Sequence, residues 1–106
     1  MELTCNLLAI NSTTRSRYDA LRRRLGTVVI SYSELADGYA FQLDERLISH
    51  RELSEWMSME RLCCPFLLLE VEPVESGVLE LRLTGPAGSK TVLLAEFGNY
   101  LNANAK

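Results

Sequence analysis

The chain has 106 residues, a length that fits one domain spanning residues 1–106. Hydrophobic residues make up 47% of it and charged residues 24%, which excludes a disordered chain and is typical of a globular protein. A formal net charge of -3 provides no overall attraction to nucleic acid, so we do not expect a nucleic-acid partner.

No segment predicts a signal peptide or a membrane-spanning helix. The opening MELTCNLLAINSTTR lacks a basic n-region, and the most apolar run, residues 66–69, ends at Glu70. We therefore expect a cytoplasmic protein without a membrane partner. Its three cysteines are expected to be reduced there, and their odd number argues against a simple disulfide framework.

The first half of the chain predicts a strand, a helix and a hairpin. Residues 3–10 are mostly apolar and predict a strand. The NSTT cluster at 11–14 predicts the start of a helix that ends near Leu25, with Gly26 as its stop. Residues 27–35 and 39–44 then predict two strands joined at Asp37-Gly38, since both turn positions tolerate positive φ.

The second half repeats this alternation. SHRE at 49–52 is a capping box that opens a second helix, and Pro65 predicts its end near Cys64. Residues 66–74 and 77–83 predict two strands, and GPAGSK at 85–90 precedes a last helix.

The element order β-α-β-β-α-β-β-α predicts an α+β fold. An antiparallel sheet with helices on one face is the expected architecture, and the first six elements match a ferredoxin-like arrangement. We expect the last strand to add at an edge of that sheet. The last helix would pack beside the other helices or on a partner subunit.

The segment ERLCCPF, residues 60–66, carries the chemistry of the second helix. Cys64 continues a stripe formed by Leu53, Met57 and Glu60, with Trp56 and Cys63 beside it. Glu60 is the one charged member of this stripe, and a buried carboxylate needs a partner, a proton or a cavity. Glu60 and Cys64 are one helical turn apart and can touch.

Two interpretations of these residues remain open. In the first, the cysteines are small core residues and Glu60 pairs with an arginine of the first helix. In the second, Cys63 and Cys64 bind a soft metal or a trivalent metalloid ion, with Cys5 as a third sulfur ligand. Glu60 would tune or cap this site, and Arg61 would balance its charge. A ferredoxin-like path places Cys5 roughly 16 Å from the pair, which favours binding by Cys63 and Cys64 alone.

Thiol redox catalysis is a third and less favoured interpretation. The C-terminal end of a helix and an ionised Glu60 both disfavour a thiolate. His50 lies roughly 20 Å from Cys64 along a continuous helix, which excludes a Cys–His dyad within that helix. A disulfide between the adjacent Cys63 and Cys64 would be strained and easily reduced.

Two other patterns favour ordinary structural roles. GPAGSKT at 85–91 fails the P-loop pattern because Ser89 separates Gly88 from Lys90, although a helix start can hold an anion. The first helix carries five arginines, and a solvated face paired with acidic residues is the favoured explanation.

The motif E-R-x-C-C-P-F also resembles the signature of a group of small uncharacterised bacterial proteins. Glu60, Arg61, Cys63, Cys64, Pro65 and Phe66 match it, and similar segments follow MerR-type DNA-binding regions in some regulators. Weaker similarities are Cys5-Asn6-Leu7 and Gly85-Pro86-x-Gly88. The resemblance implies a small α+β domain with a tie to metals or metalloids, although this chain has no DNA-binding segment of its own.

Our leading hypothesis is therefore a non-catalytic protein that binds a thiophilic metal or metalloid ion through Cys63 and Cys64, with Cys5 as a third candidate ligand. The alternative is a homodimeric structural or small-ligand-binding module in which the cysteines belong to the core.

Overall fold

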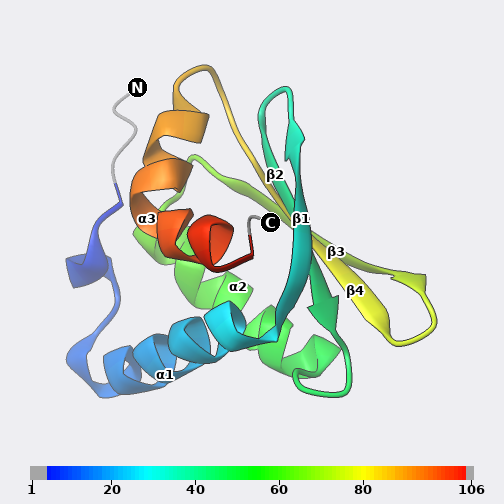
Figure 1. Ribbon diagram of the computed structural model, residues 1–106. Helices are drawn as coiled ribbons and strands as arrows, with labels where there is room; N and C mark the ends of the chain where they lie inside the picture. Colours follow the sequence, from blue (N-terminus) through cyan, green and yellow to red (C-terminus); the bar gives the residue numbers. More distant parts are fainter. Residues whose placement is uncertain (1–4, 105–106) are drawn as a thin grey trace.

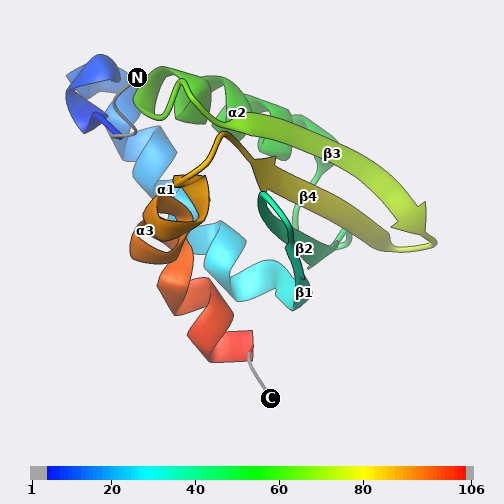
Figure 2. The same cartoon turned by 90° about the horizontal axis from the view of Figure 1, so that it is seen from above.

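The computed structural model of the protein describes residues 5–104. Its helices are α1 (Ser12–Val28), α2 (His50–Cys63) and α3 (Ser89–Asn104), and a short 3-10 helix, η1 (Leu7–Ala9), precedes them. The strands are β1 (Val29–Leu35), β2 (Gly38–Asp44), β3 (Leu68–Glu75) and β4 (Val78–Thr84). The three α-helices lie on one side of an antiparallel sheet, which confirms the predicted α+β class (Figures 1 and 2).

The sheet has the strand order β1-β2-β4-β3. The last strand, β4, is therefore central, and the prediction that it adds at an edge of the sheet is wrong. Thr84 of β4 pairs with Gly38 of β2 on one side and with Leu68 of β3 on the other. A tight turn at Gly77, with φ of 82°, keeps β4 beside β3. Alternate β4 leucines are buried, because they lie on the face of the sheet that packs against the helices. In a ferredoxin-like sheet this central position belongs to the first strand, and here β4 fills it.

The predicted strand at 3–10 is wrong for the residues that the structure describes, while Leu3 and Thr4 lie outside them. The Asn6 side chain accepts a hydrogen bond from the Leu8 N–H at 3.0 Å, and the Asn6 carbonyl accepts one from Ala9 at 3.0 Å. These local bonds form the 3-10 turn η1 in place of an extended strand. With β4 in the central position, the place of the first strand in a ferredoxin-like sheet is already filled.

Helix α1 also runs past its predicted stop at Gly26 and ends at Val28. Tyr18, Leu21, Leu25 and Val28 are all buried, at helical spacings of three and four residues. Burial of Val28 offsets the modest cost of a glycine inside a helix, which is about 1 kcal/mol.

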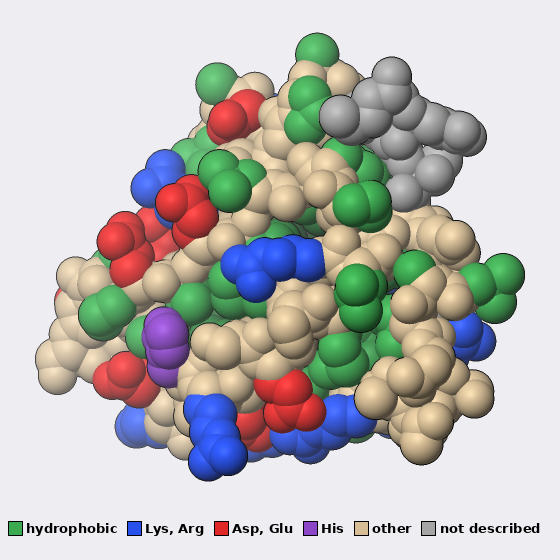
Figure 3. All heavy atoms as spheres, turned by 180° about the vertical axis from the view of Figure 1, so that it is seen from behind, with side chains coloured by type: hydrophobic (Ala, Val, Ile, Leu, Met, Phe, Trp, Pro, Cys, Tyr) green, Lys and Arg blue, Asp and Glu red, His purple; other side chains and the backbone are tan. Residues whose placement is uncertain are grey.

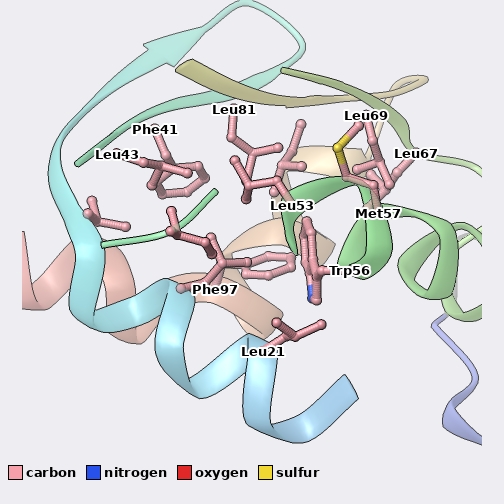
Figure 4. Packing of buried hydrophobic residues seen from close by; sticks show 14 of the residues in the cluster. Leu21, Phe41, Leu43, Leu53, Trp56, Met57, Leu67, Leu69, Leu81 and Phe97 are labelled. Carbon is pink, nitrogen blue, oxygen red and sulfur yellow. The ribbon is translucent and has the colours of Figure 1, made fainter. Parts of the chain in front are cut away.

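The core lies between the helices and the inner face of the sheet. Figure 4 shows Trp56 of α2 beside Phe97 of α3, with Leu21 of α1 close to both. The rings of Trp56 and Phe97 meet edge to face with centroids 6.1 Å apart. Beside them is a cavity of only about 10 Å³. Such a space holds one water molecule at most, so this cavity has no room for an organic ligand.

The basic face of α1 is paired with acidic residues, as predicted. Arg17 forms two hydrogen bonds with Glu55 of α2, and Arg24 forms an ion pair with Glu52. Basic and acidic side chains are interspersed on the face drawn in Figure 3. Among the described residues, no helix is both long and apolar enough to span a membrane.

Candidate thiol site at the end of helix α2

Helix α2 presents its buried stripe as predicted. Ser49 caps its start, and Ser49 and Glu52 form the reciprocal bonds of a capping box. The buried residues of the helix are Leu53, Trp56, Met57, Glu60 and Cys63. The helix ends at Cys63, and the Cys64 N–H donates to the Glu60 carbonyl at 2.7 Å. Pro65 follows directly, so Cys64 leaves the helical conformation with its side chain still in the core.

Cys5 meets this helix end, which corrects two expectations. The sulfurs of Cys5 and Cys64 form a disulfide, and the Cα atoms of the two residues are 4.4 Å apart. The expected separation of about 16 Å is wrong because residues 5–10 form no strand of the sheet. They fold over the end of α2, where the Asn6 N–H donates to the Cys63 carbonyl at 2.7 Å. The expectation that all three cysteines are reduced is also wrong for this structure, because Cys5 and Cys64 form a disulfide and Cys63 is a free thiol.

Four potential ligand atoms gather at this point. The three sulfurs of Cys5, Cys63 and Cys64 and a carboxylate oxygen of Glu60 all lie within 4.8 Å of one another. The Cys64 sulfur is 3.1 Å from Oε1 of Glu60 and 3.9 Å from the Cys63 sulfur. Cys63 and Cys64 are both 0% exposed, whereas Cys5 is only partly buried. The cluster therefore has one solvent-facing member.

Glu60 is 1% exposed and finds its partner on α1. The Tyr18 hydroxyl donates to Oε2 of Glu60 at 2.8 Å, and Arg22 donates to the same hydroxyl at 3.3 Å. Burial raises the pKa of Glu60, and the Tyr18 hydrogen bond and the positive charge of Arg22 offset part of that rise. The arginine of the first helix that we expected to pair with Glu60 is Arg22, and it contacts the Tyr18 hydroxyl, which in turn contacts the Glu60 carboxylate.

The free thiol of Cys63 is not activated. Burial raises its pKa, and the negative charges of Glu60 and Glu96 raise it further. A raised pKa keeps the sulfur as a neutral thiol at neutral pH, which argues against Cys63 as an enzymatic nucleophile.

The structure places Arg61 outside the cluster. Its side chain is exposed and donates to the Leu69 carbonyl at 3.3 Å. The arginine on the cluster side is Arg22, which also pairs with Glu96 of α3 at 3.7 Å and stacks over Phe97. Sequence reasoning missed Tyr18 and Arg22, although their spacing of one helical turn on α1 was the available signal.

The start of α3 does not present the anion site considered above. Ser89 is 1% exposed, and its hydroxyl has no hydrogen-bond partner among the described residues. Lys90 forms an ion pair with Glu34. The surface hollow beside them, of about 200 Å³, is also lined by Asp37, whose charge opposes an anion.

Comparison with models of protein families, with curated proteins and with solved structures found no match. The resemblance of ERLCCPF to small bacterial proteins and to segments of MerR-type regulators therefore stays an expectation. The chemical interpretation of the site depends on its own geometry.

Proposed function

We propose that the reduced protein binds a trivalent metalloid or another thiophilic ion through Cys5, Cys63 and Cys64. The observation that carries this proposal is the convergence of three sulfurs and one carboxylate oxygen within 4.8 Å. A metal–sulfur bond of about 2.3 Å allows two sulfurs on one ion to lie up to about 4.6 Å apart. The Cys63 and Cys64 sulfurs, 3.9 Å apart, already lie within this limit, whereas the Cys5 and Cys64 sulfurs must move apart after reduction to lie around an ion.

Charge balance favours a trivalent metalloid over a divalent metal. Three thiols react with a metalloid trihydroxide to give three metalloid–sulfur bonds and three water molecules, and the product carries no charge. Three thiolates on a divalent cation would instead leave a net negative charge next to the buried Glu60. The nearby cation, Arg22, already pairs with Glu96, so an extra buried anion would be poorly compensated.

Glu60 has a supporting role in this proposal. Its Oε1 lies against the Cys64 sulfur, where it can accept the proton of the reduced thiol. Tyr18 and Arg22 hold the other side of the carboxyl group in place. This arrangement orients the Cys64 sulfur toward Cys63 and Cys5 and does not require Glu60 to become a ligand.

The test is intact-mass spectrometry of the reduced, desalted protein with stoichiometric arsenite. We expect an adduct that gains one arsenic and loses three hydrogens, which reports three sulfur ligands. The double variant Cys5→Ser/Ser54→Cys is the matched control, because it keeps three thiols but moves one to the exposed face of α2. It should give only a two-sulfur adduct that retains one hydroxide.

The alternative function is the structural or small-ligand-binding module with core cysteines, for which we also predicted a homodimer. The complete burial of Cys63 and Cys64 favours it. It predicts that the reduced, folded protein gives no arsenite adduct and that these two thiols react with alkylating agents only after unfolding. That result would overturn the ion-binding proposal.

A further inference from the structure

The disulfide joins two of the three sulfurs that the proposed ion site requires. Cys5 and Cys64 are linked, and Cys63 is the one free cysteine. In this state the cluster offers a single thiol and a carboxylate. A single buried thiol is a weak site for a trivalent metalloid, so the oxidised protein lacks the binding capacity that we propose for the reduced one.

We propose that the Cys5–Cys64 disulfide is a reversible redox latch that closes the ion site. The inference rests on the proposed function and adds its regulation. Small cytosolic thiols, with their disulfides, are the class of reductant and oxidant that would operate the latch. The three sulfurs have different roles, because Cys5 and Cys64 change between disulfide and thiol while Cys63 remains a free thiol in both states.

Exposure determines where an external thiol attacks. Cys5 is partly exposed, whereas Cys63 and Cys64 are fully buried behind it. A small-molecule thiolate therefore reaches the Cys5 sulfur first and forms a mixed disulfide there. The electron pair of the broken S–S bond leaves on the Cys64 sulfur, which takes up the proton released by the attacking thiol.

A second small-molecule thiol completes the opening of the latch. It attacks the outer sulfur of the mixed disulfide, forms a small-molecule disulfide and releases Cys5 as a thiol that takes up the second proton. In sum, two thiols are oxidised to one disulfide while the protein disulfide is reduced to two thiols. Closing the latch is the reverse reaction, with a small-molecule disulfide as the oxidant.

The latch also joins the N-terminal segment to α2. The Asn6 N–H donates to the Cys63 carbonyl, so the backbone of Cys5 and Asn6 stays next to the helix end through a bond that does not depend on the disulfide. After reduction this contact keeps the Cys5 thiol close to its partners. The segment therefore favours both re-formation of the disulfide and capture of an ion.

The test equilibrates the folded protein in glutathione buffers of varied redox ratio, quenches thiol exchange with acid, and then traps all free thiols with N-ethylmaleimide in denaturant, so that the buried Cys63 is also counted. Intact mass should change from one trapped thiol to three as the buffer becomes reducing. Cys63→Ser should keep the same transition with one thiol fewer in each state, whereas Cys64→Ser and Cys5→Ser should lose it. Peptide mapping without reduction should find Cys5 joined to the peptide that carries Cys64.

Arsenite then separates the two proposals. We expect the adduct on the reduced wild-type protein and its loss on the oxidised form. An oxidised protein with its disulfide intact that binds arsenite as well as the reduced protein does, or a Cys5–Cys63 or Cys63–Cys64 linkage in place of Cys5–Cys64, would overturn the latch alone. A reduced protein that cycles as described but never binds arsenite would instead overturn the proposed function.

Discussion

Reduction of the Cys5–Cys64 disulfide should strongly destabilise the protein. The two cysteines are 59 residues apart in sequence. The chain-entropy model gives an unfolded-state entropy loss of about 14 cal/mol/K for a loop of this length, or about 4 kcal/mol at 25 °C. Domains of this size have unfolding free energies of only about 5–15 kcal/mol, so the disulfide would supply a large share of the total.

Urea unfolding followed by tryptophan fluorescence measures this difference directly. Trp56 is the single tryptophan and is 0% exposed, so its emission reports the loss of the core. The oxidised protein should unfold at clearly higher urea concentration than the reduced protein. Cys5→Ser, which cannot form the disulfide, should unfold at the same concentration with and without reductant.

One result would refute the loop-closure reasoning. If oxidised and reduced wild-type protein unfold at the same urea concentration, while thiol trapping confirms that their redox states differ, the disulfide does not constrain the unfolded chain as calculated. The bonds of Asn6 to α2 and of α1 to Glu60 would then have to account for the stability of this end of the molecule.

Three further changes test the packing and charge of the same region and of the sheet. Burial places the folded pKa of Glu60 above its ordinary value of 4.5, against the opposing effects of Tyr18 and Arg22. The unfolding free energy of the wild type, measured relative to that of Glu60→Gln by urea unfolding between pH 4 and 8, should therefore fall as pH rises from about 4.5 through the folded pKa. Tyr18→Phe removes the donor to Glu60 and should cost about 1–3 kcal/mol in the same assay, whereas Tyr32→Phe on the sheet should cost less. Gly38→Ala places a Cβ 1.9 Å from the Leu83 carbonyl oxygen, so it should lower the melting temperature strongly. Gly77→Ala places its Cβ in open space but on a residue with φ of 82°, so it should lower the melting temperature less, at a cost of about 1–2 kcal/mol.

Local sequence signals predicted most of the fold. The capping box at Ser49 and the proline after Cys64 depend on interactions between near neighbours, and both mark helix ends as expected. The predicted hairpin turn at Asp37-Gly38 lies one residue earlier, at Ala36-Asp37, and neither Asp37 nor Gly38 has the expected positive φ. The prediction of a strand at residues 3–10 was wrong because apolar content does not distinguish a strand from a segment packed on a helix end. Asparagine is a residue type that favours turns, so Asn6 was the sequence signal for η1, and its side chain accepts the hydrogen bond that starts this turn.

The composition of the site could be predicted, but its assembly could not. The helical stripe placed Glu60 beside Cys64 correctly, because residues four apart on a helix share a face. The position of Cys5 depended on sheet topology, and β4 took the central position that we had assigned to the first strand. The partner of Glu60 depended on how α1 crosses α2, which no local pattern specifies.

The central position of β4 also determines how the chain can fold. Each hairpin, β1–β2 and β3–β4, pairs residues that are close in sequence, so both can form early. The β2–β4 pairing joins Gly38 to Thr84 and Asp44 to Val78 across the whole of α2, and it must close a long loop. During synthesis β2 therefore has an unpaired edge until β4 has left the ribosome, and an unpaired edge of this kind is a site for edge-to-edge association.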